Sequence, residues 1–561
     1  MKRLHVNYKN NQRKILYASV FVVFLFMSVG YSVLKSDLSI KGKIKVVGYK
    51  EPILAVNGSN TSYIFNKELD RNTVEKIEFK DSTVIPDNVL DSWDASANKD
   101  SSVVAYILDE DNNDLYELYI IGRGGVKANI DSNRVFYKFS NLKAILFNHN
   151  YDTRMATDIT AMFCGCASLT NLDLSDFNTS NVKNIYAMFS GCTSLSELNV
   201  NSFDTQNVID MGRLFENCST IEEINTLVFN TSKVTNMNAM FSGCSSLAEL
   251  DLNNFDTQSV TNMSCIFQNC RSLQKLNLNT FNTINVTNMR YMFDGCIGLQ
   301  EIDLSNFNTS NVTDMFAMFI RCSSLIKINL NSFDTSKVKN MAHMFRECNN
   351  LANINLSNFI TQNVTNMENM FYGCSSLTEL NISSFNTSSV TTMVSIFQGC
   401  KELTSLDLSG FNTSKVTNME NMFNGCINIT SLDLSNFDTL NVTNMSWMFT
   451  NNYNLSTLNL SSFNTSNVTD IGHMFEGCTS LSELNLSSFN TSKVTYMKSL
   501  FKGCAKLLNL NISNFTFENV TETTDMFTSS YNLMNIIVKD EVAKTFIEGI
   551  NSTANVTIQD L

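Results

Sequence analysis

The sequence predicts an α/β solenoid: a leucine-rich-repeat-like, right-handed coil of 26-residue repeats with a parallel β-sheet, short helices and a small β-rich N-terminal cap. Phenylalanine recurs every 26 residues from Phe163 to Phe527. A second phenylalanine runs at the same period from Phe177 to Phe515, and a valine from Val182 to Val520, without insertion. A unit this short cannot bury its apolar face alone, so successive units must stack and share a core.

One repeat reads L-x-x-L-x-L-S-x-F-[ND]-T-x-x-V-x-x-M-x-x-M-F-x-G-C-x-x. Its first half ends in the alternation of a strand, as at Leu484 and Leu486. Its second half spaces Val494, Met497 and Leu500 as one face of a short helix. We expect the Asn-Thr-Ser between the halves to cap that helix at its N-terminus.

A glycine three residues after the second methionine, as at Gly191, suits the left-handed residue that ends a helix. Asparagine, which tolerates the same conformation, replaces it at Asn217 and Asn451. Arg321 and Glu347 stand at this position in two other coils, and we expect those two turns to be deformed.

The ends of a stack of repeats need caps. We predict a β-rich capping domain over 37–132, with two strands around an Asp-Asn-rich turn in 103–130. The solenoid is expected over 133–538, about 14 to 15 coils, and 133–163 resembles a degenerate first coil. Residues 539–561 begin as an amphipathic helix and are expected to be the C-terminal cap. We expect a monomer.

The N-terminal segment 1–36 has the features of an export signal. Five basic residues precede an uncharged apolar run over 15–34, which is long enough to span a bilayer. Ser28-Val29-Gly30 could serve as a cleavage site, so a cleaved signal peptide and an uncleaved membrane anchor both remain open. Either outcome places the repeats outside the cell. The net charge of −13, with no basic stripe, argues against a nucleic-acid partner.

A file of cysteines follows the same period. Metal binding needs ligands arranged around one point, whereas this file offers sulfurs along a line. Disulfides between neighbouring coils would require the Cβ atoms to be drawn together. We therefore favour buried thiols that pack as small hydrophobes, and we expect neither a metal nor a cofactor. The slot at 452 holds asparagine, and Cys164 and Cys265 lie off the file as candidates for exposed, reactive thiols. The file comprises Cys166, Cys192, Cys218, Cys244, Cys270, Cys296, Cys322, Cys348, Cys374, Cys400, Cys426, Cys478 and Cys504.

A second file, between the last two strand leucines, holds only Asn or Asp, from Asp173 to Asn511. It faces outward in leucine-rich repeats. An amide ladder along the stack is the favoured interpretation. A repetitive surface for sugar hydroxyls or calcium stays open, although no calcium-loop motif accompanies the file.

A specific binding site should lie where the repeats differ. Aromatic and basic residues gather at variable positions of consecutive coils and could form one patch, since both types are favoured interface anchors. Scattered surface residues are the competing interpretation. The candidate patch consists of Arg290, Tyr291, Phe316, His343, Arg346 and Tyr372. The rival face is the partly acidic flank of the strands, with Glu197, Glu223, Glu249, Glu301, Glu379 and Glu483.

The segments "NTSNVTDMFAMFIRC" (308–322) and "NTSKVTNMENMFNGC" (412–426) resemble the BspA-like leucine-rich repeat surface proteins of bacteria. The branch with the F-[ND]-T-S-x-V-T-x-M-x-x-M-F-x-G-C repeat is the most similar, over about 135–540. This resemblance implies a cell-surface protein, some of whose relatives bind host matrix proteins or other cells. A C-terminal wall-sorting motif of anchored relatives is missing, so attachment is expected through the N-terminal segment.

We therefore predict an exported protein, secreted or anchored at the cell surface, that binds a macromolecule such as a protein or glycan on another cell or matrix. The alternative is a structural spacer without a specific ligand, which the near-identity of the coils favours. An enzyme is not expected. The four histidines do not recur with the cysteines, and residues 40–132 contain neither Cys nor His.

Overall fold

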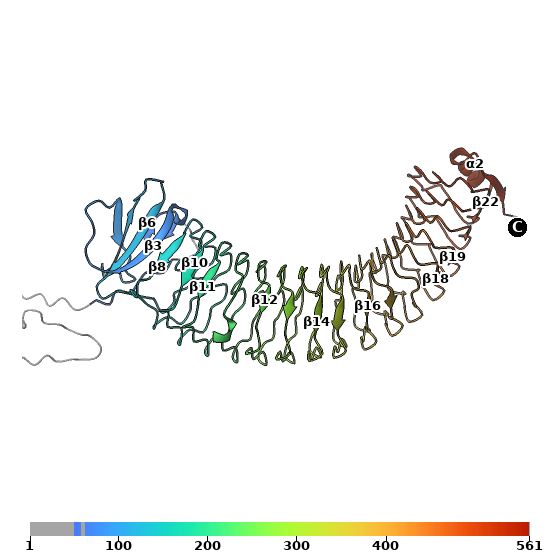
Figure 1. Cartoon of the computed structure of the whole chain (residues 1–561). Coiled ribbons are helices and arrows are strands. Elements are labelled where there is room, and N and C mark those ends of the chain that lie inside the picture. Colours follow the sequence, from blue (N-terminus) through green and yellow to red (C-terminus); the bar gives the residue numbers. More distant parts are fainter. Residues whose placement is uncertain (1–49, 58–61, 560–561) are drawn as a thin grey trace, which may run out of the picture.

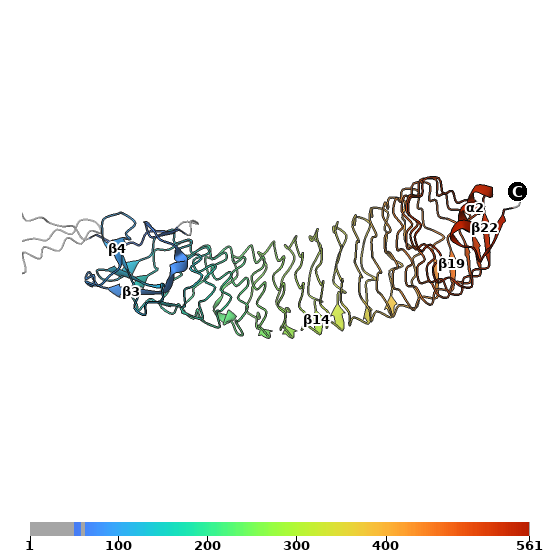
Figure 2. The ribbon, with the colours of Figure 1, turned by 90° about the horizontal axis from the view of Figure 1, so that it is seen from above.

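The computed structural model describes residues 50–57 and 62–559, which form a solenoid. The coils stack into an arc with a β-sheet domain at one end and helix α2 (Glu541–Ile550) at the other (Figure 1). From above, the strands lie along one flank of the arc (Figure 2). The predicted solenoid with parallel strands is confirmed. None of the helices in the described ranges is long and apolar enough to cross a bilayer. The predicted apolar segment 15–34 lies outside those ranges.

The N-terminal domain is built on a five-stranded sheet whose edge belongs to the first coil. Its order is β4 (Asp91–Asp94), β5 (Val103–Leu108), β6 (Tyr116–Gly122), β3 (Val74–Asp81) and β8 (Ala144–Leu146). β5 and β6 pair antiparallel, which confirms the two strands predicted around the Asp-Asn-rich turn. β3 runs parallel to both β6 and β8. Shorter elements are β1 (Tyr63–Ile64), β2 (Lys67–Glu68), η1 (Arg71–Thr73), β7 (Val126–Lys127) and β9 (Tyr151–Asp152).

The coil strands are two to four residues long and pair in parallel at a register of one repeat, so that Leu172 lies opposite Leu198. They are β10 (Asn171–Asp173), β11 (Glu197–Asn199), β12 (Glu249–Leu250), β13 (Lys275–Leu276), β14 (Glu301–Asp303), β15 (Lys327–Asn329), β16 (Asn353–Ile354), β17 (Glu379–Leu380), β18 (Ser431–Asp433), β19 (Thr457–Asn459), β20 (Glu483–Asn485), β21 (Asn509–Asn511) and β22 (Asn535–Val538). A 3₁₀ turn, η2 (Thr226–Val228), follows where one coil has no strand.

The second half of each coil is a series of turns, so the predicted short helices are wrong. In residues 185–192 the N–H groups of Ala187 and Phe189 donate to carbonyls of the next coil, at 2.8 and 3.0 Å. The N–H groups between them, such as that of Met188, bond three residues back instead of four. The backbone donors therefore link coils rather than form a helix. The apolar residues at helical spacing are buried all the same, because the turns also direct their side chains into the core.

Two residues in each turn series adopt a left-handed conformation, for example Ala187 (φ 55°) and Gly191 (φ 76°). Arg321 and Glu347 do so as well, with φ of 61° and 59°. Their N–H groups bond to the next coil at 2.7 Å, as the glycines do. The expectation that these two turns are deformed is therefore wrong. A left-handed residue with a Cβ costs about 1–2 kcal/mol, and the bonding of both neighbouring coils maintains it.

Stacked side chains fill the core. The first phenylalanine file forms nearly parallel ring pairs from Phe136 to Phe527, with centroids such as those of Phe163 and Phe189 at 5.9 Å. In the second file the ring of Phe307 lies 6.5 Å from that of Phe333. The two sides of a coil therefore stack at different spacings, which is consistent with the curvature of the arc.

The threonine of the Asn-Thr-Ser segment caps no helix and is instead buried between coils. Thr179 Oγ1 donates to the carbonyl of Asp204 at 2.9 Å and accepts from its N–H at 2.7 Å. The same pair of bonds joins Thr309 to Asp334. Each such threonine thus satisfies both backbone groups of one residue in the next coil.

Strand β23 (Asn555–Ile558) and helix α2 close the C-terminal end on its strand side. β23 pairs with β22 in parallel and so extends the sheet beyond the last coil. Asp540 caps α2 by accepting from the N–H of Ala543. Ala543 and Ile547 are buried, so the predicted amphipathic C-terminal helix is confirmed.

Candidate functional site

The six predicted patch residues come together on one side of the solenoid. We call this side the turn face, because it is formed by the turn series in the second half of each coil. We call Arg290, Tyr291, Phe316, His343, Arg346 and Tyr372 the ring-and-guanidinium surface. All six side chains are half-buried. Tyr291 and His343 occupy the non-glycine left-handed position of their coils, with φ of 54° and 61°. This surface spans four consecutive coils.

Three rings form a continuous chain across these coils. The centroids of Tyr291 and Phe316 lie 5.2 Å apart with the planes at 75°, and Phe316 and His343 lie 5.2 Å apart at 67°. The guanidinium of Arg290 lies over the Phe316 ring, 4.9 Å from its centroid. Edge-to-face packing and the cation–π contact hold these side chains in place before any partner arrives.

A second cation–π pair continues the surface. Arg346 lies 4.5 Å from the centroid of Tyr372, and its Nε donates to Glu347 at 3.1 Å. Burial, followed by the charge of Arg346, lowers the pKa of His343. This shift favours the neutral imidazole, and its buried Nδ1 has no hydrogen-bond partner among the described residues.

The structure adds carboxylates that the sequence did not identify. Asp314 lies 3.3 Å from Arg290, and the buried Asp294 accepts from Nη2 of Arg321 at 2.6 Å. These acids come from neighbouring coils, 24 and 27 residues away, so only the stacking register brings them together. The guanidinium charges are thus largely balanced, and the surface presents rings and directed N–H donors rather than a strong positive field.

The cysteine file is a row of buried thiols, as the packing interpretation predicts. All fifteen cysteines are free. Each buried sulfur donates to the carbonyl of a phenylalanine in the preceding coil, as Cys192 does to Phe163 at 3.2 Å. Burial raises the pKa of these thiols, that of Cys218 to about 12. Cys164 and Cys265 are half-buried rather than exposed, and burial raises their pKa as well.

Six overlapping stretches of the chain match one family model, described as "Mycoplasma protein of unknown function, DUF285". They cover residues 130–249, 196–277, 241–353, 267–380, 347–432 and 424–539, which together make up more than half of the chain. The chain belongs to the DUF285 family. No curated protein matches it.

Among solved structures, this DUF285 chain is similar to the functional domain of InlJ from Listeria monocytogenes, described as including a cysteine ladder. The identity is 14%, the match covers 76% of this chain and 72% of that one, and the TM-score is 0.18. A chain of the TLR13–ssRNA13 complex matches at 14% identity, over 77% of this chain and 87% of that one, with a TM-score of 0.15.

The Asn/Asp file of the DUF285 coils lies at the C-terminal ends of the strands. Asp173 accepts from the N–H of Ser175 at 3.0 Å, and the amide of Asn199 donates to the same oxygen at 3.0 Å. Hydrogen bonds from Ser409 and Ser435 lower the pKa of Asp407 and Asp433. The favoured ladder interpretation is supported where Asn199 follows Asp173 and where Asn329 follows Asp303, whereas the amide of Asn277 donates to Asn253 rather than to Asp251. Most of these side chains also accept from an N–H group of the turn that follows.

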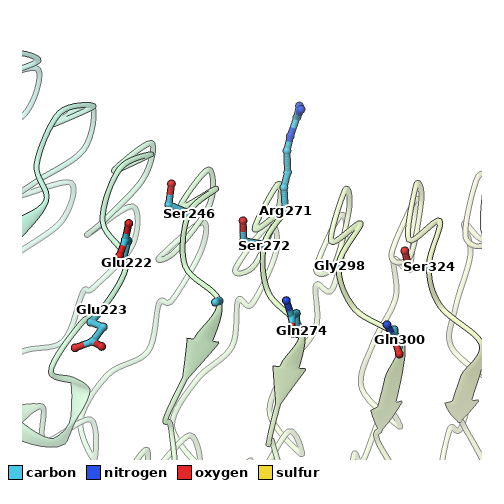
Figure 3. A pocket seen from close by; sticks show the side chains of 10 residues that line it. Glu222, Glu223, Ser246, Arg271, Ser272, Gln274, Gly298, Gln300 and Ser324 are labelled. Carbon is cyan, nitrogen blue, oxygen red and sulfur yellow. The ribbon is translucent and has the colours of Figure 1, made fainter.

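The acidic strand flank has a shallow polar hollow of about 720 Å³ near the starts of several strands. Glu222, Glu223, Arg271, Gln274 and Gln300 are among its lining residues, and Figure 3 shows them on successive coils. The Arg271 side chain extends away from Glu223 (Figure 3). The hollow holds no chain of contacting rings comparable with that on the turn face.

In the N-terminal domain, carboxylate oxygens of Glu75, Asp111 and Glu117 lie within 4.8 Å of one another. No metal motif is visible in the sequence here, because Glu75 lies in β3, more than 30 residues before the other two. Lys143 Nζ donates to Glu75 at 2.6 Å, and Asn113 bonds both Glu75 and Asp111. The hydrogen bond from Lys143 is the main cause of the lowered pKa of Glu75. The ammonium thus balances one of the two buried carboxylates of this group.

Proposed function

We propose that this DUF285 protein is an exported, BspA-like surface protein, and that it binds a protein or glycan on another cell or matrix through the ring-and-guanidinium surface. It acts as a binding protein rather than an enzyme. One observation carries the proposal: rings and guanidinium groups of four consecutive coils contact one another here, whereas the stacked rings of Trp447 and His473, at the same coil positions farther along the turn face, join two coils.

The chemistry of the surface suits a protein or glycan partner. Tyrosine and arginine are over-represented among the residues that dominate binding energy. Here Arg290 and Arg346 are already positioned over rings, so less side-chain entropy is lost on binding. Because Asp314 and Glu347 balance their charge, a polyanion gains little from this surface.

Export and surface attachment rest on the sequence of residues 15–34. A basic flank followed by an apolar run of this length directs a chain to the membrane, either as a signal peptide or as an anchor. The repeats would then face potential partners outside the cell.

A structural spacer is the second candidate. Near-identical coils provide length and stability, whereas selective recognition needs differences between coils. The two candidates differ in whether substitutions confined to the ring-and-guanidinium surface have any effect on binding.

The test is retention of surface proteins and glycans by residues 40–561. We expect simultaneous Tyr291→Ala, Phe316→Ala and Tyr372→Ala substitutions to abolish binding, because the loss removes both the apolar contact and the supports of the two arginines. Tyr186→Ala is the matched control, since Tyr186 occupies the same coil position as Phe316, five repeats earlier. Undiminished binding by the triple variant contradicts the proposal. Retention of no partner by the unmodified protein favours the spacer.

A further inference from the structure

Within the turn series, from the first methionine to the glycine of each repeat, the backbone hydrogen bonds between coils all run in one direction, whereas the N–H of the residue after the valine, such as Thr495, donates to the preceding coil. In residues 497–503, four N–H groups donate to carbonyls of the next coil. The acceptors are Glu522, Thr524, Met526 and Thr528, at distances from 2.8 to 2.9 Å. The same pattern occurs in coil after coil, so donors always point toward the C-terminal end of the solenoid and acceptors toward the N-terminal end.

The last coil therefore ends in a row of donors. Thr523, Asp525, Phe527 and Ser529 correspond to the four donors one repeat earlier, and their N–H groups have no acceptor among residues 50–57 and 62–559. The last coil nevertheless keeps the backbone conformation of the other turn series. Asp525 and Ser529 are left-handed (φ 60° and 64°), and the hydrogen bonds three residues back persist at 3.1 Å, as from Met526 to Thr523.

At the N-terminal end of the solenoid, side chains of the N-terminal domain donate to the backbone carbonyls that would otherwise accept from a preceding coil. Asn57 donates to the carbonyl of Val135 at 2.6 Å, and Arg71 donates to that of Tyr137 at 2.6 Å. Both capping side chains are buried. At the C-terminal end, β23 extends the sheet beyond β22, and residues 550–553 border the last turn series without supplying an acceptor to its N–H groups.

Apolar surface is uncovered beside the open donors. The ring of Phe527 stacks on Phe501 at 5.5 Å and is half-buried, whereas Phe501 is fully buried. Tyr531 is 85% exposed. A hollow of about 660 Å³ lies between this coil and the segment that follows α2, with Asp525, Phe527 and Tyr531 in its lining.

We propose that this end binds a peptide segment of another protein as one further rung. Carbonyl oxygens of the peptide accept from the N–H groups of Thr523, Asp525, Phe527 and Ser529, and an apolar side chain covers Phe527 and Tyr531. This mode resembles the addition of a peptide strand to an exposed sheet edge, but it takes place on the turn face of a solenoid. Main-chain hydrogen bonds provide affinity, and side-chain contacts provide specificity.

The charges and the ladder direction select this occupant. Glu518, Glu522 and Asp525 lie at the same end, so a free anion is repelled whereas a neutral or basic peptide is not. A second copy stacked head to tail is disfavoured because Asn57 and Arg71 already occupy its carbonyls. Two copies joined by their C-terminal ends would place donors against donors.

The experiment uses the full chain and a phage-displayed library of random 12-residue peptides as the probe. We expect selection of peptides with apolar residues and no acidic ones. Tyr531→Ala should weaken their binding about tenfold. Val542→Ala, at an exposed position on α2, is the control and should leave affinity unchanged.

Amide hydrogen exchange followed by mass spectrometry identifies the site directly. In the free protein, residues 520–531 should exchange faster than residues 494–505, and the selected peptide should slow their exchange. Three outcomes overturn the proposal: equal protection of both segments in the free protein, no enrichment of peptides, or enriched peptides that leave exchange in 520–531 unchanged. Concentration-dependent dimerisation that is lost in the Tyr531→Ala variant would assign the end to a second copy instead.

Discussion

At the scale of single residues, the repeated polar positions are explained by hydrogen bonds between coils or within the turn of one coil. Cysteine sulfur donates to a phenylalanine carbonyl, threonine holds both backbone groups of its neighbour, and Asn or Asp fixes the turn after the strand. These repeated residues therefore stabilise the stacked coils and are not evidence of a ligand site. The exceptions to the files carry more information than the files do.

Asn452 is such an exception. It occupies a cysteine slot and is buried, and neither side-chain oxygen nor nitrogen has a hydrogen-bond partner in the described ranges. We predict that Asn452→Cys stabilises the protein by about 1–3 kcal/mol, the usual cost of an unsatisfied buried polar group. The new thiol would donate to the Phe423 carbonyl, as its homologues do in other coils.

Urea unfolding measures this change. Cys426→Asn, which creates the same defect one coil earlier, should lower the unfolding midpoint by a similar amount. A lower midpoint for Asn452→Cys would show that the amide has a role other than filling the file.

At the scale of elements, a coil is two ladders joined by turns. The strand side has short parallel pairs, and the turn side has alternating bonds within and between coils. The sequence pattern predicted both halves as apolar and repetitive, but Val, Met and Leu at helical spacing fit a helix and a turn series equally well. Only the stacking decides between them, because it provides acceptors in the next coil.

Threonine at the junction of the two halves offers a test at this scale. We predict that Thr309→Val destabilises the protein by about 1–3 kcal/mol, because the N–H and carbonyl of Asp334 both lose a partner. Ser310→Ala removes only a bond to Asn308 within the same turn and should change stability by less than about 0.5 kcal/mol. Equal effects of the two substitutions, measured by urea unfolding, would contradict the role assigned to the threonine.

At the scale of the whole molecule, the repeat period made the solenoid and the cysteine packing predictable from sequence. It also placed all six patch residues on one surface, because residues at equal coil positions must become neighbours. The paired carboxylates Asp314 and Asp294 were not predictable. Arg290 and Arg321 reach these carboxylates in neighbouring coils, and Arg321 does so from a turn that was expected to be deformed.

The central claim is that differences between coils, and not the coils themselves, carry binding. The most direct test removes two whole repeats and keeps the register, so that Thr283 is followed by Ser336. This deletion of 284–335 takes away Arg290, Tyr291 and Phe316. The control deletion of 388–439 has the same length and joins Thr387 to Leu440. Because each coil contacts only its neighbours, both shortened solenoids should fold.

The measurement is the affinity of both shortened proteins for a partner retained by the full chain. We predict that the deletion of 284–335 abolishes binding and that the control deletion leaves it unchanged. Equal affinity of the two shortened proteins would contradict the claim.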